Sequence, residues 1–180
     1  KQLGLTKNDL RLKSYVDLDF KGRNIDDFLG TADLRNAVLT NDSTQLSFDY
    51  LSLSSIIIDG KKRLNASSNE ADVSIAGDFN ILDLPNATLS FLHTYFPSYI
   101  AQPKKQAKNQ DFTFEVTTRN IAAYIDLLNI PVKGFDNSTV KGRISTRENT
   151  FEVQTDVPAF QYNAITFNNS SITAKGDYKR

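Results

Sequence analysis

Several residue types that build reactive or metal-binding sites are absent or scarce in this 180-residue chain. It contains no cysteine, which excludes disulfides, zinc–thiolate sites, iron–sulfur clusters and thiol nucleophiles. It has a single histidine, which excludes multi-histidine metal sites and argues against histidine-based catalysis. Tryptophan is also missing, and with it the usual platform for stacking a sugar ring.

Charge and hydropathy narrow the function classes further. The chain has 21 Lys and Arg against 21 Asp and Glu, so its net charge is zero. A neutral chain gives no electrostatic reason to expect nucleic acid as a partner. No apolar run approaches the roughly 18 residues that span a membrane. Because the chain also lacks methionine, we expect it to be a fragment of a longer polypeptide.

No arrangement of side chains predicts an enzyme or a metal site. His93 has neither a nucleophile nor an orienting carboxylate near it in the sequence. Asp26 and Asp27 lack the spacing of a calcium loop, and Asp17 and Asp19 read as a solvated strand face. The scattered glycines form no phosphate-binding loop. We therefore expect no catalytic residues, no metal and no cofactor.

Composition favours strands joined by turns. Asp outnumbers Glu by 17 to 4, and Asn occurs 16 times. Asp and Asn favour turns and caps over helix interiors. A hydrophobic content of 39% is enough for a sheet that is apolar on one face only.

Alternating apolar and polar residues place these strands. Turn residues at Asp59–Gly60 predict a hairpin, and a phase slip near Arg35–Asn36 predicts a bulge. The predicted strands are Asp9–Phe20, Ala32–Leu39, Leu46–Leu53, Ile56–Ile58, Arg63–Ser67, Val73–Phe79, Asp111–Thr117, Thr139–Thr146, Thr150–Thr155, Ala159–Tyr162 and Ala164–Ala174.

Two segments have helical periodicity instead. Residues 83–96 predict one amphipathic helix, with Asp83 as its N-cap, and residues 120–128 predict a second. Residues 101–110 are polar, basic and aperiodic, and we expect a mobile, solvated loop there. We expect residues 1–180 to form a single unit, with possible sub-units 1–100 and 111–180 joined by that loop.

A serial order of short stretches resembles a known family. The stretches are Leu18–Asp19–Phe20–Lys21–Gly22, Ile25–Asp26–Asp27–Phe28–Leu29–Gly30–Thr31–Ala32, Asp72–Val73–Ser74–Ile75–Ala76–Gly77–Asp78–Phe79, His93–Thr94–Tyr95–Phe96–Pro97–Ser98–Tyr99–Ile100, Asn120–Ile121–Ala122–Ala123–Tyr124–Ile125–Asp126–Leu127–Leu128, Val140–Lys141–Gly142 and Phe151–Glu152–Val153. In this order they resemble an internal fragment of TamB-like proteins of the AsmA-like superfamily, the inner-membrane component of the translocation and assembly module, in its Bacteroidetes form.

The resemblance implies a long periplasmic protein that is anchored in the bacterial inner membrane. Such a protein reaches toward an outer-membrane barrel partner of the TamA type. It is built from curled β-sheets, also called β-tacos, whose concave face is apolar. The family is implicated in outer-membrane assembly, protein secretion and phospholipid transport, and has no catalytic motif.

The sequence thus predicts a mainly β fold, a curled antiparallel sheet with a groove and two short amphipathic helices. An apolar groove would hold phospholipid acyl chains while their headgroups stay in water. The candidate groove-lining residues are Leu10, Leu12, Val16, Leu18, Phe20, Leu46, Phe48, Phe151, Val153, Ile165 and Phe167. For any one of them the alternative is a place in a sealed core.

Two other functions fit the same patterns. The chain could be a structural scaffold for outer-membrane protein assembly without lipid transit, using sheet edges to bind added strands. It could also be an extracellular β-sandwich that binds adhesion partners or carbohydrate, although it lacks tryptophan and a calcium motif.

Overall fold

The computed structural model describes residues 10–41, 44–95, 101–103, 105, 107–122, 125, 133–162 and 164–177. Its elements are β1 (Leu10–Lys21), η1 (Ile25–Asp27), β2 (Leu29–Asn41), β3 (Thr44–Ile58), β4 (Lys61–Ser68), β5 (Ala71–Asp78), η2 (Ile81–Asp83), α1 (Leu84–Tyr95), β6 (Asp111–Thr118), β7 (Lys133–Gly134), β8 (Thr139–Ser145), β9 (Thr150–Tyr162) and β10 (Ile165–Asp177), where η marks a 3₁₀ turn.

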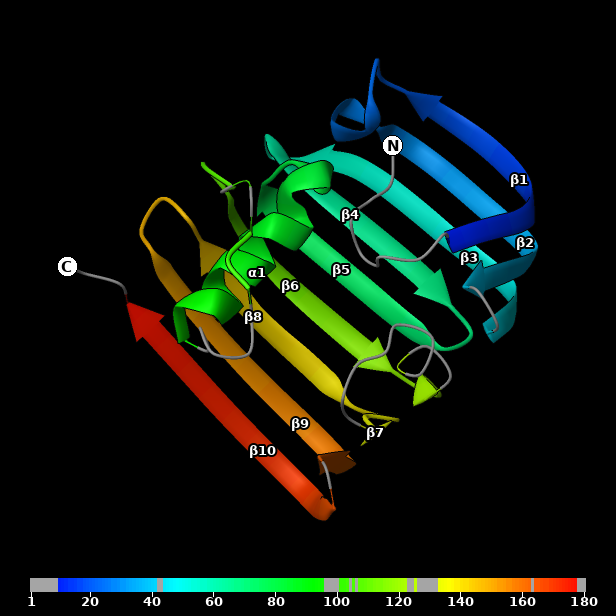
Figure 1. Ribbon diagram of the computed structural model, residues 1–180. Helices are drawn as coiled ribbons and strands as arrows, with labels where there is room; N and C mark the ends of the chain where they lie inside the picture. The colour runs from blue at the N-terminus through cyan, green and yellow to red at the C-terminus, as the bar shows by residue number, and fades with distance from the viewer. Residues whose placement is uncertain are drawn as a thin grey trace.

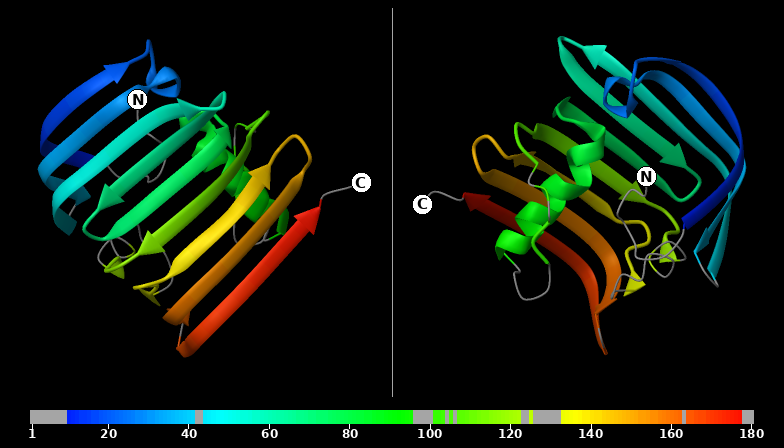
Figure 2. Two further views of the ribbon diagram at one scale, coloured as in Figure 1. Left: turned by 180° about the vertical axis from the view of Figure 1, so that it is seen from behind. Right: turned by 45° about the horizontal axis from the view of Figure 1, so that its top comes forward.

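All ten strands belong to one antiparallel sheet, in the order β1-β2-β3-β4-β5-β6-β8-β9-β10, with the short β7 paired to β9 (Figure 1). The sheet is open, because β1 and β10 lie at opposite ends of this order. It is curved, and α1 lies on its concave side (Figure 2). The predicted mainly β, curled antiparallel fold is confirmed.

Local sequence explains the hairpin between β3 and β4. Asp59 and Gly60 both have positive φ, at 50° and 75°. A two-residue turn of this kind matches the twist of the strands that it joins, and Asp-Gly is among the sequences that favour it. The hairpin predicted at Asp59–Gly60 is confirmed.

The predicted phase slip near Asn36 occurs at the same point in β2 and β3, so the alternation of apolar residues changes phase in both strands together. Asn36 has a left-handed φ of 49° and lies opposite Asp49, and the β2–β3 register skips both residues. The pairing on either side of them is unchanged. Against β1, which has no extra residue, the register shifts between Lys13 and Tyr15. The predicted bulge is confirmed, and it keeps the apolar residues of β2 and β3 on one face.

A similar change of phase occurs near the other end of the sheet. Asn169 of β10 also has a φ of 49° and lies opposite Pro158 of β9, and again the register skips both residues. Pro158 therefore lies inside a continuous strand. The prediction of separate strands at Thr150–Thr155 and Ala159–Tyr162 was wrong, because the unpaired position accepts a residue without an N–H group.

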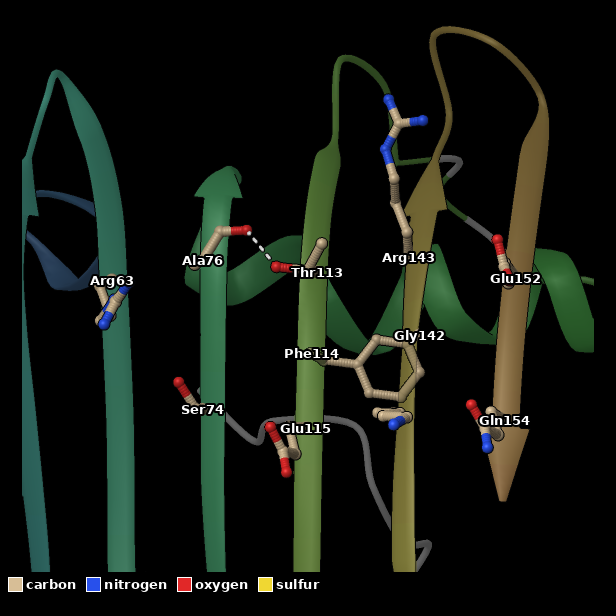
Figure 3. Close-up of a pocket in the computed structure, with 11 residues that line it drawn as sticks. Arg63, Ser74, Ala76, Thr113, Phe114, Glu115, Gly142, Arg143, Glu152 and Gln154 are labelled. Atoms are coloured by element: carbon tan, nitrogen blue, oxygen red, sulfur yellow. Dashed lines mark hydrogen bonds between the residues drawn. The ribbon is translucent and has the colours of Figure 1, made fainter. Parts of the chain in front are cut away.

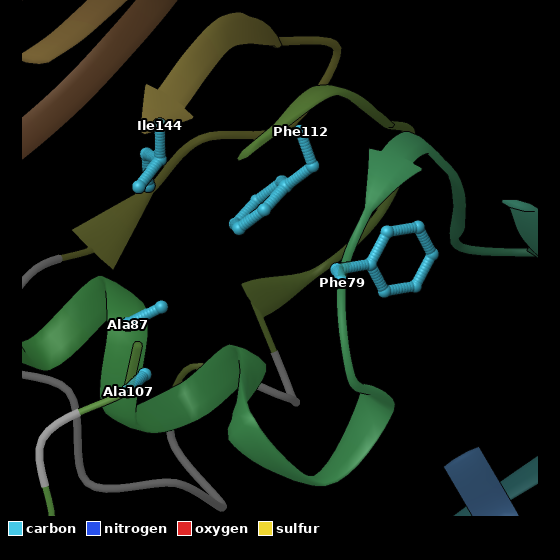
Figure 4. Close-up of a cluster of buried hydrophobic side chains, with 5 residues drawn as sticks. All are labelled: Phe79, Ala87, Ala107, Phe112 and Ile144. Carbon is cyan, nitrogen blue, oxygen red and sulfur yellow. The ribbon is translucent and has the colours of Figure 1, made fainter. Parts of the chain in front are cut away.

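Helix α1 closes the core against part of the concave side (Figure 4). Ala87 of the helix packs with Phe79, Phe112 and Ile144, and Ala107 of the following connection joins the same cluster. The predicted helix at residues 83–96 is thus present, although it begins at Leu84 after the turn η2.

The connection at residues 101–110 is irregular, as predicted, but its described residues are not all solvated. Ala107 is buried, and Gln110 is only 1% exposed because its side chain accepts from Asn80 N and donates to the Lys108 carbonyl. The expectation of a solvated loop was wrong here. Strand β5 pairs directly with β6 across this connection.

The second predicted helix, at residues 120–128, lies largely outside the described residues. Ile125 N donates to Ile121 O over 3.1 Å, which is helical spacing.

Candidate functional site

The strand registers put apolar residues from the whole sheet on one face, which we call the concave face. Directly paired residues share a face, so each register row can be followed from strand to strand. One such row runs through Leu18, Ala32, Leu53, Ala66, Val73, Val116, Val140 and Thr155. The face is apolar because the alternation in each strand agrees with that of its neighbours.

The predicted groove residues whose side chains are described lie on four strands of this face. Leu12, Val16, Leu18 and Phe20 lie along β1, while Phe48 is on β3 and Phe151 and Val153 are on β9. Ile165 and Phe167 are on β10. Because the alternation of β10 changes phase at Asn169, they lie on the same face as Ile172. Leu10 and Leu46 belong to β1 and β3 by their backbones, but their side chains lie outside the described residues.

These residues differ in exposure. Leu12, Val16, Leu18 and Phe20 are about half exposed, at 50%, 55%, 53% and 49%. Ile165 and Phe167 on the other edge strand are also exposed, whereas Phe48 is buried. Phe151 packs against the core cluster beneath α1. The predicted residues of the two edge strands are therefore exposed, whereas Phe48 is buried and Phe151 packs in the core beneath α1.

Sequence reasoning missed many residues of the same face. They are Leu34, Leu39, Leu51, Leu53, Leu64, Val73, Ile75, Phe112, Phe114, Val116, Val140 and Ile144. Their alternation was visible in the sequence, but the register that joins them to the chosen residues was not.

Five phenylalanines of this sheet lie directly opposite a glycine on the neighbouring strand. The pairs are Phe20–Gly30, Phe112–Gly77, Phe114–Gly142, Phe151–Gly176 and Phe160–Gly134. A Cβ on Gly77 would lie 2.3 Å from the Asp111 carbonyl oxygen, so a side chain there has no room. The bare glycine backbone leaves space across the strand for the ring.

One charged residue of the strands, Lys62, has its register position on the concave face, opposite Gly77 and Ile57. Its Nζ donates to the carbonyl oxygen of Asp26 in η1 and lies 5.7 Å from the centroid of the Phe79 ring. Asp26 Oδ1 in turn accepts from Leu82 N in η2 over 3.0 Å. We call Asp26, Lys62 and Leu82 the clasp.

The clasp joins connections that are far apart in the sheet order. Turn η1 links β1 to β2, and η2 links β5 to α1, while β3 and β4 lie between them. The clasp therefore bridges one end of the concave face and holds its only strand-borne cation there among the described residues.

The opposite, convex face is mainly polar, although it also carries the exposed side chains of Tyr15, Tyr50, Ile56 and Ile58. A shallow hollow of about 510 Å³ lies there over β4, β5, β6, β8 and β9, with α1 behind the strands (Figure 3). Small residues such as Ser74, Ala76 and Thr113 form its floor, and Arg63 and Arg143 rise on either side. A hollow with this polar lining suits solvent rather than an apolar small molecule.

Ion pairs on and around this polar face stabilise the strand ends. Arg143 binds Asp111 through two hydrogen bonds of 2.9 Å, and this lowers the pKa of the Asp111 carboxyl below its ordinary value despite partial burial. Hydrogen bonds from Arg119 and then from Ser67 lower the pKa of Asp72. Both pairs are partly exposed, so they contribute little to stability individually.

Other candidate chemistry finds no support in the described part of the chain. No group of three or more potential metal ligands comes together there. None of the described helices combines the length and apolarity that crossing a membrane requires. His93 lies half-buried on α1.

Comparison of the chain with protein-family models, with curated proteins and with solved structures finds no match.

Proposed function

We propose that this chain is a periplasmic module of a TamB-like, inner-membrane-anchored envelope protein, and that its concave face binds phospholipid acyl chains. The module would support phospholipid transport and outer-membrane assembly, with an outer-membrane barrel of the TamA type as partner of the parent protein. It would act without catalysis or a cofactor.

One observation carries the proposal: the concave face is apolar across an open sheet and stays half exposed along β1. An exposed, contiguous apolar surface on a protein indicates a ligand or partner. Acyl chains fit it because they need apolar contact and no fixed polar site. A chain that moves along such a face exchanges one methylene contact for another, so each step costs little free energy.

The lone cation also fits a path for acyl chains. Lys62 is held at one end by the clasp, so the middle of the concave face carries no charge in the strands described. A charge placed there would have to lose its water whenever a chain bound.

The test compares the amount of phospholipid bound by two variants, one substituted on the concave face and one on the opposite face of the same strand. Protein isolated from bacterial membranes is analysed by native mass spectrometry for bound phospholipid. Leu18→Glu puts a charge on the concave face, and Tyr15→Glu puts one on the other face of the same strand, where Tyr15 is 76% exposed. We expect Leu18→Glu to reduce bound lipid roughly tenfold, since it removes apolar contact and adds a charge.

Photo-crosslinking gives an independent measurement. A photoreactive phenylalanine analogue at Phe20 should label acyl chains, and the same analogue at Tyr15 should not. Equal lipid binding by the two glutamate variants, together with equal labelling from both positions, would refute the proposal.

The scaffold function remains a second candidate, because both edge strands are long. β1 has 12 residues and β10 has 13, and each pairs with one neighbour among the described strands. Substitutions on strand edges would then abolish function in cells, while charges on the concave face would not. The third alternative, a two-sheet sandwich, does not agree with the single sheet.

A further inference from the structure

On its convex side, edge strand β1 carries charged residues that would pair with opposite charges in an antiparallel copy of the same strand. Arg11 and Lys13 precede Tyr15, and Asp17 and Asp19 follow it at the same spacings. All five side chains are exposed and share the convex side of the strand. Among the described strands, β1 pairs only with β2 and forms one edge of the sheet (Figure 1).

We propose that β1 pairs antiparallel with β1 of a second copy of this chain, with Tyr15 at the two-fold axis. In that register Arg11 faces Asp19 of the second copy and Lys13 faces its Asp17. By symmetry the dimer contains each of these ion pairs twice.

The same register matches the apolar side. Leu12 faces Leu18 of the second copy, so the concave faces of the two sheets join without a change of side. Sliding the pairing by two residues in one direction sets Arg11 against Lys21. Sliding it in the other direction sets Lys13 against Tyr15. Only the register centred on Tyr15 pairs all four charges.

A second observation is that two facing carboxylates of β1 and β2 have no cationic partner among the described residues. Asp17 lies directly opposite Asp33 of β2, and like charges at such positions destabilise a strand pair. Among the described residues, neither carboxylate has an ion-pair partner, and the same holds for Arg11, Lys13 and Asp19. In the dimer, Lys13 of the second copy stands next to Asp17. This inference is independent of lipid binding.

Charge reversal on β1 tests the proposal. Sedimentation of the full chain across a concentration series should show a transition from 20.2 kDa to twice that mass. Asp17→Lys with Asp19→Lys makes all four paired positions cationic, and Arg11→Asp with Lys13→Asp makes the same four positions anionic. Each double variant should stay monomeric, and an equimolar mixture of the two should form heterodimers that high salt weakens.

Thr166→Lys with Thr173→Lys adds two charges to the other edge strand, β10, and should leave dimerisation unchanged. A wild-type chain that is monomeric at its highest soluble concentration would overturn the proposal. So would β1 variants that still dimerise, or variants whose mixture fails to associate.

Cysteine crosslinking provides a readout that does not depend on the charge variants folding. The chain has no cysteine, so one introduced thiol is an unambiguous reporter. Tyr15→Cys should crosslink two copies under oxidation or with a short thiol-specific linker. Lys21→Cys is the matched control, since its two copies would lie about 40 Å apart along the paired strands. Equal crosslinking at both positions would contradict the register.

Discussion

Removing the Asp26 carboxylate should open the clasp without unfolding the sheet. Asp26 joins η1 to η2 through a hydrogen bond of 3.0 Å from Leu82 N. In Asp26→Ala that bond is lost, while the Asp26 carbonyl that accepts from Lys62 stays in place. We therefore expect a local effect confined to the end of the concave face.

The size of the effect follows from the exposure of this hydrogen bond. A hydrogen bond to a charged group contributes about 1.5–3 kcal/mol. The bond lies at an exposed site, and Leu82 is 46% exposed, so water can replace the lost acceptor. We therefore take about 1 kcal/mol, below that range, which corresponds to roughly fivefold faster hydrogen exchange at the Leu82 amide.

Hydrogen exchange measured by NMR provides the assay, and Asp27→Ala is the matched control. Asp27 lies in the same turn, but its carboxylate accepts from Asn24, the N-cap of η1, over 2.8 Å and has no recorded bond to η2 among the described residues. Asp26→Asn keeps an oxygen acceptor and should fall between the wild type and Asp26→Ala. If the Leu82 amide exchanges equally in Asp26→Ala and Asp27→Ala, the clasp does not hold this end of the face.

Two further predictions concern stability. Gly77→Ala should lower the free energy of unfolding by about 3 kcal/mol or more in urea titrations, since φ is +141° and the new Cβ would lie 2.3 Å from the Asp111 carbonyl oxygen. Gly60→Ala, with no atom within 4 Å, should cost clearly less, and equal losses would refute the steric reason. Stability should also fall in acid: the pKa of Asp111 is lowered in the fold by Arg143, so this ion pair stabilises the protein above the ordinary carboxyl pKa. Its contribution disappears as the pH falls through the lowered value, and Asp111→Asn should have a shallower loss of thermal midpoint between about pH 6 and pH 3 than the wild type.

Sequence alternation predicted the fold class and most strand positions, because period-two patterning is a local property. The strand at Leu10–Lys21 and the hairpin at Asp59–Gly60 needed no tertiary information. The gap predicted between Thr155 and Ala159 contains Pro158, and only the pairing shows that the strand continues through this position without a register partner there.

The candidate site was predicted in part for the same reason. Alternation chose the correct face along β1, but it could not show that Phe48 is buried while Leu18 is half exposed. Exposure depends on which strands become edges and on where α1 packs, and both are properties of the whole sheet. The clasp was beyond sequence reasoning, because Asp26 and Leu82 are 56 residues apart.

The change of face at Asn36 has a consequence for insertions and deletions. Asn36 and Asp49 lie opposite each other, and the pairing on both sides of them continues in one register. Deleting either residue alone would shift half of the β2–β3 hairpin. Deleting both would restore strict alternation in each strand and would also remove the bulge against β1. The two residues therefore form one structural unit, and the sheet tolerates the loss of either only when the other is lost with it.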